Sequence, residues 1–309
     1  DGVQYEEPKS QYVGKETPSV TTTPTREGWT FAGWHETIPA LMPNEDLVIN
    51  GHFTKEYIVD GVKYLLRSDT KEARVIGNDN PVSVTINPSI EFESNNYTIV
   101  AIEARAFKGA ESLTTVDLSK ATNLTSIGNA IFADCSLLNS VSLPATLTEI
   151  TDSMFCNCIA LSALTIPASV TKIGESAFRH SGIIEMTLPK SITSMGTSVF
   201  KSCANLKSIV FETDMSLSTL PNSTFEECNI LESFTLPTSM KEIGEKAFYN
   251  CDGLKLLELD NVVTIGISAF NHCSNLKEIN LPPTIKYLLK NAFYNCQKVE
   301  KMTINSDEA

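Results

Sequence analysis

A repeating pattern of apolar and polar positions runs through the last two-thirds of the chain. An apolar residue regularly lies five positions before a phenylalanine. This phenylalanine recurs every 22 to 25 residues, at Phe107, Phe132, Phe155, Phe178, Phe200, Phe225, Phe248, Phe270 and Phe293. Self-similarity at a period of this length is typical of solenoids, in which each repeat packs only on its neighbours. The pattern therefore predicts nine stacked repeats over residues 102–309.

Each repeat also contains a short stretch in which apolar and polar residues alternate, as in Leu-Lys-Glu-Ile-Asn-Leu-Pro at residues 276–282. Alternation with period two is typical of a half-buried strand. Proline has no N–H to donate and ends the pairing after five of these strands, at Pro144, Pro167, Pro189, Pro237 and Pro282. We expect the strands to join in one parallel sheet, and the segment around each phenylalanine to form one short helical or 3₁₀ turn.

Seven of the eight cysteines share one repeat position, three residues after the phenylalanine: Cys135, Cys158, Cys203, Cys228, Cys251, Cys273 and Cys296. This placement predicts a buried column of thiols that act as small apolar side chains, and it disfavours both disulfides and a zinc site. Cys156 lies off the column, so an exposed reactive thiol and a partly buried inert one both remain open. The fourth repeat, at Ser181-Gly182-Ile183, lacks the cysteine and is one residue short.

The motif Ile-Gly-x-x-Ala-Phe-x-x-Cys-x-x-Leu-x-x-Leu-x-Leu-Pro resembles the BspA-like, or Treponema pallidum type, leucine-rich repeat. Residues 243–251 and 265–282 match it almost position by position, and the resemblance covers residues 100–305. It implies a β-rich α/β fold: a right-handed solenoid with a parallel sheet on its concave face and short helical or 3₁₀ turns on the other. It also implies a bacterial protein at the cell surface or outside the cell.

The first hundred residues divide into two further parts. Residues 55–101 predict an N-terminal cap with an incomplete first repeat, containing a hairpin that turns at Asp60-Gly61, another near Asn95-Asn96, and a repeat-like strand around Val84. Residues 1–54 resemble the Listeria–Bacteroides repeat, the internalin B-repeat type, which implies a small β-grasp-like module. Its aromatic side chains have two readings, packing within a small domain or a platform for carbohydrate: Trp29, Phe31 and Trp34.

Charge and composition limit the range of functions that the chain can have. The net charge of −13 and the lack of a basic stripe make nucleic-acid binding unfavourable. No run of apolar residues is long enough to span a membrane. The four histidines, His35, His52, His180 and His272, are scattered along the sequence. Because acid–base and metal chemistry depend heavily on histidine, we expect no enzyme, no cofactor and no metal site.

The outward positions of the repeat strands form two columns on the expected concave face. These columns are rich in hydroxyl side chains, which either serve binding or only suit a pleated sheet. The candidate binding residues are Thr115, Asp117, Ser140, Ser142, Thr165, Glu185, Thr187, Ser208, Ser233, Thr235, Leu256, Glu258, Glu278 and Asn280. We expect a monomeric adhesin that binds host or matrix proteins; a structural spacer and a glycan-binding protein are the alternatives. A second candidate surface comprises Tyr249, Tyr287 and Tyr294.

Overall fold

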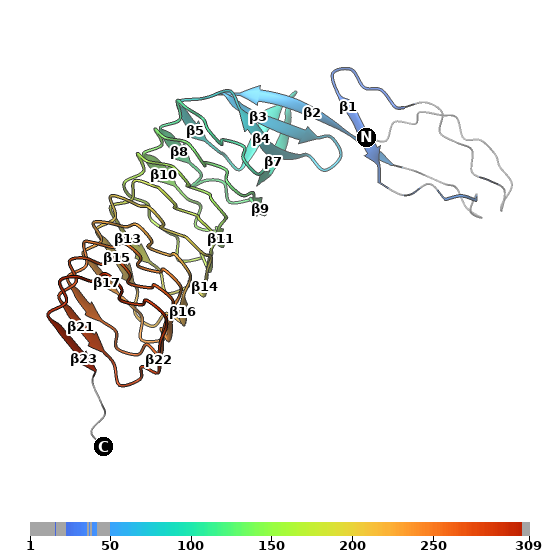
Figure 1. The fold of residues 1–309 in the computed structure, drawn as a ribbon. Coiled ribbons are helices and arrows are strands. Elements are labelled where there is room, and N and C mark those ends of the chain that lie inside the picture. The colour runs from blue at the N-terminus through green and yellow to red at the C-terminus, as the bar shows by residue number, and fades with distance from the viewer. Residues whose placement is uncertain (1–15, 17–22, 36, 38, 42–49, 305–309) are drawn as a thin grey trace.

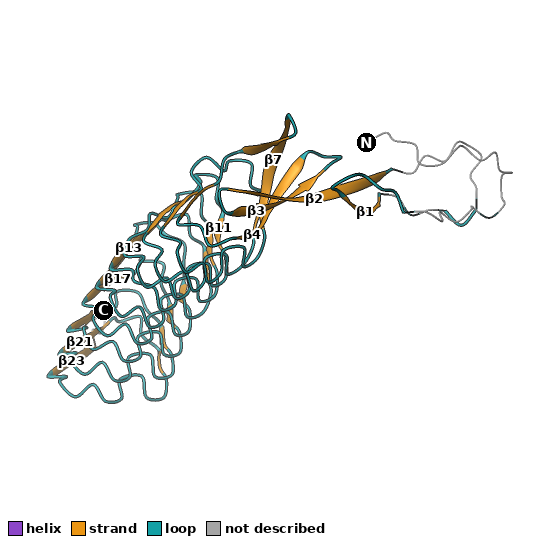
Figure 2. Cartoon of the chain, turned by 90° about the horizontal axis from the view of Figure 1, so that it is seen from above, coloured by secondary structure: helices purple, strands orange, loops and turns teal. Residues whose placement is uncertain are grey.

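The computed structural model describes residue 16 and residues 23–35, 37, 39–41 and 50–304. Across these residues the protein contains 23 strands and no helix (Figures 1 and 2). An elongated stack of coils occupies most of the molecule, and a twisted sheet adjoins its N-terminal end. The module expected at residues 1–54 lies mostly outside the described residues, so its β-grasp fold stays a prediction.

The N-terminal sheet joins the cap to the stack. It contains β1 (Thr30–Trp34), β2 (Gly51–Val59), β3 (Val62–Arg67), β4 (Glu72–Asn78), β7 (Asn95–Ile102) and β6 (Ser89–Phe92), in that order. The hairpin between β2 and β3 turns at Asp60 and Gly61, whose φ angles of 50° and 73° suit a type I′ turn, as predicted. The hairpin between β6 and β7 turns at Glu93 and Ser94, two residues before the predicted position. β7 then pairs in parallel with β4 and with the first coil.

The predicted alternating strands form one side of the stack, which we call row one. Its three parallel sheets contain β5 (Ser83–Thr85), β8 (Thr115–Asp117) and β10 (Ser140–Ser142); β13 (Glu185–Leu188), β15 (Ser208–Phe211) and β17 (Ser233–Thr235); and β19 (Leu256–Glu258), β21 (Glu278–Leu281) and β23 (Lys301–Ile304). Val84 of β5 pairs with Val116 of β8, so the expected repeat-like strand of the cap is present. The parallel-sheet solenoid is thus confirmed.

A second row of parallel sheets runs along the other side of each coil, where one sheet alone was expected (Figure 1). Row two contains β9 (Ser126–Ile127), paired with β7; β11 (Glu149–Ile150), β12 (Lys172–Ile173) and β14 (Ser194–Met195); and β16 (Thr219–Leu220), β18 (Glu242–Ile243), β20 (Thr264–Ile265) and β22 (Tyr287–Leu288). Each strand is only two residues long, which is too short for an alternating pattern to show in the sequence.

The prediction of helical turns is wrong for the coils that the structure describes. In every repeat the residues two before and two after the phenylalanine have φ between 53° and 69°, in the left-handed region. A left-handed residue at every fourth position is incompatible with a right-handed helix. The amides at these two positions and at the phenylalanine donate instead to carbonyls of the next coil, as Ser153, Phe155 and Asn157 do at 2.8–2.9 Å. The turns are therefore a third hydrogen-bonded connection between coils.

The phenylalanines form a continuous ladder inside the stack. Successive rings from Phe107 to Phe293 stack with centroids 4.9–5.8 Å apart. Beside them, each of the seven column thiols donates its S–H to the carbonyl of the preceding repeat's phenylalanine at 3.0–3.2 Å. In the fourth repeat the buried Ser181 takes the cysteine position and lies 3.4 Å from Cys203 Sγ. All eight cysteines are free thiols, as predicted.

Candidate functional site

The outward side chains of row one form a broad surface, which we call the row-one face and define by the candidate residues above. Strand register aligns them across coils, as in Thr115 with Ser140 and Glu258 with Asn280. Thr165 is exposed but belongs to a coil without an assigned row-one strand, so the surface is interrupted there. The structure thus brings the candidates to one side of the stack, while their role in binding stays a prediction.

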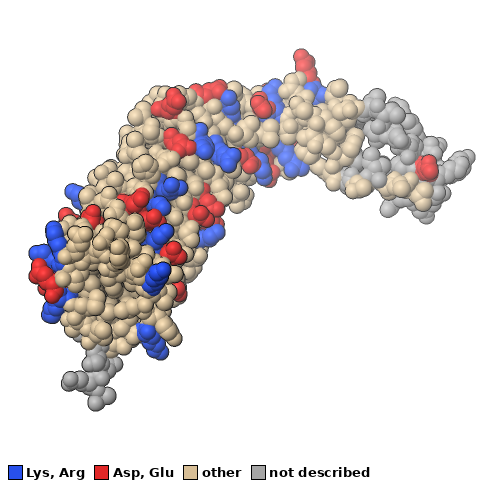
Figure 3. Space-filling model, in the orientation of Figure 1, with Lys and Arg blue, Asp and Glu red and all other residues tan. Residues whose placement is uncertain are grey.

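Charge is unevenly distributed along the row-one face. Hydroxyl side chains dominate its N-terminal part, where hydrogen bonds from the Ser119 side chain and backbone hold the pKa of Asp117 below its usual value. Leu256, Glu258 and Glu278 occupy the C-terminal part and are all exposed. Figure 3 shows acidic and basic side chains interleaved along the visible side of the stack. The charged residues that define the row-one face are all acidic, at Asp117, Glu185, Glu258 and Glu278, and they would suit a partner with a basic surface.

Row two is interrupted at two places, and each break coincides with a change at one residue position. Most coils have glycine directly after the row-two strand, because a Cβ there would strike the backbone of the preceding coil; at Gly196 it would lie 2.5 Å from Glu175 N. Thr151 and Pro221 replace this glycine, and the sheet is broken before each of their coils. The last coil has Leu289 there and stays paired, with Leu289 N donating to Ile265 O at 2.9 Å, so the loss of glycine does not by itself break the sheet.

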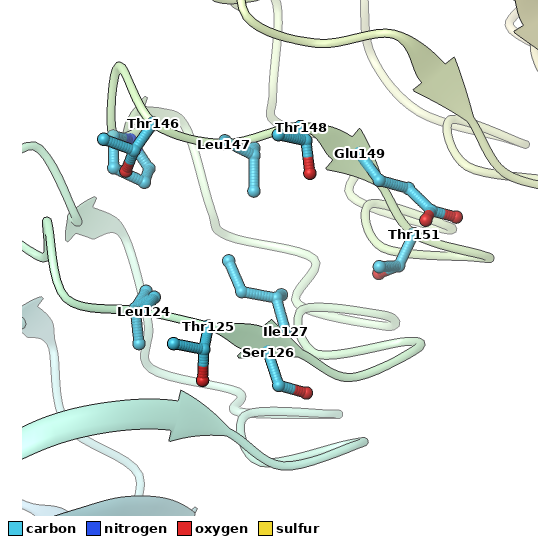
Figure 4. A pocket seen from close by; sticks show the side chains of 10 residues that line it. Leu124, Thr125, Ser126, Ile127, Thr146, Leu147, Thr148, Glu149 and Thr151 are labelled. Carbon is cyan, nitrogen blue, oxygen red and sulfur yellow. The ribbon is translucent and has the colours of Figure 1, made fainter.

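The first break opens a cavity of about 260 Å³ between the coils of β9 and β11 (Figure 4). Its lining includes Thr125, Thr148, Glu149 and Thr151, and Thr151 Oγ1 donates to Gly128 O at 2.9 Å in place of a backbone bond. A second cavity, of about 570 Å³, adjoins the cap strands and includes Tyr57, Asp60 and Glu91. Neither lining contains histidine, lysine, arginine or cysteine, so neither offers an acid–base pair with contrasting charge.

The thiols are poorly suited to nucleophilic chemistry. Burial raises the pKa of Cys135 and of Cys203 to about 11, and raises the pKa of the other column thiols as well. Cys156 is half-buried, and burial raises its pKa too, although the charge of Arg179 opposes the rise. A thiol with a raised pKa is mostly protonated at neutral pH. The partly buried, inert reading of Cys156 is therefore favoured.

The aromatic candidates separate into packing and surface groups. Trp29 packs 6.0 Å from Phe92 and 6.5 Å from Tyr97, while Phe31 lies 5.5 Å from Phe53 (ring centroids). These contacts favour the packing role over a carbohydrate platform. At the other end, Tyr249 and Tyr294 flank His272, with centroids 5.5 and 6.2 Å away, while Tyr287 lies in row two on β22.

Sequence reasoning missed one group of chemically active side chains. His35 and His52, which are 17 positions apart in the chain, lie beside Asp69. Antiparallel pairing of β1 with β2 explains the approach, because the end of one strand meets the start of the other. The fold therefore brings two of the four scattered histidines, His35 and His52, close together. No helix in the described residues is long and apolar enough to cross a membrane.

The nine-coil architecture has clear relatives. A family model for the BspA type leucine rich repeat region, in six copies, matches residues 98–228 and 200–308. The chain belongs to the BspA-type leucine-rich repeat family. A leucine-rich repeat protein from Bacteroides ovatus is similar in structure, with 26% identity, a TM-score of 0.63, and coverage of 80% of this chain and 70% of that one.

A second similar structure is that of the Treponema pallidum leucine-rich repeat protein. It has 24% identity and a TM-score of 0.52, and the similarity covers 72% of this chain and 91% of that one. At this identity the likeness shows the shared fold. No curated protein sequence matches the chain. BspA-type repeats and leucine-rich-repeat folds in general serve as interaction scaffolds.

Proposed function

We propose that the chain is a non-enzymatic adhesin module of a bacterial protein at the cell surface or outside the cell. It would bind host or matrix proteins through the row-one face, as a monomer. The observation that carries this proposal is the array of outward, mostly polar side chains that strand register aligns within three parallel sheets, interrupted at the coil of Thr165. An extended surface of this kind contacts a macromolecule over many weak points, whereas a small substrate needs a concave pocket.

The proposal places the strongest contacts toward the C-terminal coils. Leu256 is 46% exposed and lies in register with Glu278 of the next strand, β21. Glu258 lies two residues after Leu256 on β19. An exposed apolar side chain between carboxylates offers both apolar area and charge to a basic partner surface. The module at residues 1–54 remains a proposed Listeria–Bacteroides type unit ahead of the cap at residues 55–101.

The test is binding of the purified chain to a panel of immobilised extracellular-matrix proteins and to epithelial cells. The double variant Glu258→Lys/Glu278→Lys should weaken binding at least about tenfold if both carboxylates face a basic partner, since close charge pairs couple by more than about 1.4 kcal/mol. The control variant Glu175→Lys/Glu242→Lys makes the same charge change at exposed residues outside row one. It should bind like the parent chain.

Two other functions give different results in the same experiment. A glycan-binding protein would retain few partners after the panel is deglycosylated and would show defined hits on a glycan array. A structural spacer would bind neither panel nor array. Equal weakening by both double variants would mean that general charge, and not the row-one face, governs the interaction.

A further inference from the structure

His35, His52 and Asp69 come from three separate segments of the N-terminal sheet. His35 directly follows β1, His52 is the second residue of β2, and Asp69 lies in the turn between β3 and β4. One nitrogen of each imidazole and one carboxylate oxygen lie within 4.8 Å of one another. His35 Nε2 is 2.8 Å from Asp69 Oδ2, and the two imidazole rings stack with centroids 5.2 Å apart.

The backbone around the three side chains is held firmly. His35 N donates to Asn50 O at 2.7 Å, which fixes the end of the β1–β2 hairpin. The buried Ser68 donates its amide to Phe53 O and accepts from Phe53 N at its hydroxyl, both at 3.0 Å. These bonds place the β3–β4 turn against β2 next to His52. The cluster is therefore set by the fold and not by freely rotating side chains on a flat surface.

One imidazole of the cluster has a polar atom that no described residue satisfies. His52 Nδ1 is buried and has no hydrogen-bond partner among the described residues. A buried polar atom without a partner costs about 1–3 kcal/mol, so such atoms are uncommon unless something satisfies them.

Asp69 is ready to serve as an anionic ligand. Arg67 Nε donates to Oδ1 at 2.9 Å, and its terminal nitrogen donates to Oδ2 at 3.1 Å. A carboxylate has about four lone-pair sites, so Oδ2 can take an ion while Oδ1 keeps Arg67. Arg67 would then orient the Asp69 carboxylate, although the positive charge of Arg67 lowers the affinity of the site for a cation.

We propose that His35, His52 and Asp69 form a site for a divalent first-row transition-metal ion, with Zn²⁺ as the ion of best fit. Two imidazoles and one carboxylate form a common three-residue ligand set for zinc, with a fourth position for water. Magnesium and calcium prefer oxygen ligands and fit this set poorly. The bound ion would link β1 and β2 to the turn between β3 and β4, and so stabilise the packing of β1 on the rest of the N-terminal sheet. The site is independent of the adhesin proposal.

The first test is titration of the full chain with Zn²⁺ by calorimetry, with Mg²⁺ as the comparison ion. We expect one Zn²⁺ per chain, no Mg²⁺ binding, and a rise in melting temperature as Zn²⁺ increases. His35→Gln, His52→Gln and Asp69→Asn should each lower the affinity by at least about tenfold. His180→Gln, which changes a histidine in the fourth coil, should leave it unchanged.

The second test separates this site from the thiols, which also attract zinc. In histidine-labelled protein, Zn²⁺ should shift the imidazole signals of His35 and His52 and leave those of His180 and His272 in place. Absence of Zn²⁺ binding at millimolar concentration would overturn the proposal. So would binding that survives all three ligand substitutions, or binding that is lost in Cys156→Ser, because either result would place the ion elsewhere. Circular dichroism of each variant distinguishes loss of a ligand from loss of the fold.

Discussion

The glycine that follows most row-two strands makes a sharp prediction possible. In Gly196→Ala, the new Cβ would lie 2.5 Å from Glu175 N and 2.7 Å from Glu175 Cα, both backbone atoms that cannot rotate away. The coil must then move back from its neighbour, as the coils of Thr151 and Pro221 already do. We therefore expect the β12–β14 pairing to open in this variant.

The magnitude follows from the bonds at risk. Gly196 N donates to Ile173 O at 2.8 Å, and Thr193 N donates to Thr171 O at 2.9 Å. Two backbone hydrogen bonds contribute about 1–3 kcal/mol together. Replacing glycine by alanine also stabilises the folded state by about 0.4–1 kcal/mol through the unfolded chain. Subtracting the second range from the first leaves a net loss of about 0–2.6 kcal/mol in the free energy of unfolding, with a midpoint near 1.3 kcal/mol.

Urea unfolding followed by far-ultraviolet circular dichroism measures this loss. The matched control is Gly77→Ala in β4, where the nearest atom to a new Cβ is Lys63 Cδ at 3.6 Å, an ordinary contact. The control should be as stable as the parent chain or more stable by up to about 1 kcal/mol, because it gains the unfolded-chain contribution without the clash. Equal stability of the two variants would refute the argument that glycine is required there by the preceding coil. Thr151→Gly tests the reverse change, because it restores glycine after β11. The amide of residue 151 should then exchange its hydrogen more slowly, since β11 could pair with β9 and close the break.

Three further predictions concern the core and the titratable groups. Phe225→Ala removes a fully buried ring between two stacked neighbours and should lower the free energy of unfolding in urea by about 3–5 kcal/mol. Phe293 is half-buried and has one stacked neighbour in the described coils, so Phe293→Ala should lower it clearly less. Equal losses would contradict the ladder. An aromatic disulfide reagent at pH 8 should modify Cys156 slowly and leave Cys251 unmodified in the folded protein, and rapid modification of Cys251 would contradict the buried column. Burial, with the charge of Asp60, raises the pKa of Tyr64 to about 12. The contribution of the neutral phenol to the free energy of unfolding is therefore complete below pH 10 and is lost between pH 10 and 12. Tyr64→Phe should flatten the dependence of the free energy of unfolding on pH in that window, and an unchanged dependence would contradict the assignment.

The stacked coils could be predicted from the sequence because they rest on side-chain identity at fixed spacing. The phenylalanine and cysteine positions recur throughout the repeats, and an interior column requires such recurrence. The row-one strands show the period of two that half-buried strands need. The hairpin at Asp60-Gly61 was equally visible, because few residue pairs suit a type I′ turn.

The turns and row two could not be predicted because the backbone determines them. The left-handed positions hold Ser, Asn, Asp, Lys, His, Glu, Arg and Ala as well as one glycine, so their composition gives a weak signal. What holds them is hydrogen bonding to the next coil, which is invisible within a single repeat. The His35–His52–Asp69 cluster was missed for a related reason. Strand pairing and a turn bring its members together, and sequence distance conceals that contact.

The most direct test of the central claim is carboxylate footprinting of the chain in complex with a matrix protein from the binding panel. Chemical labelling of exposed carboxylates would be compared between the free and bound chain, residue by residue. The account predicts protection of Glu185, Glu258 and Glu278 on the row-one face, with Glu175 and Glu242 labelled as in the free chain. Protection of Glu175 and Glu242 instead, or no bound partner anywhere in the panel, would contradict it.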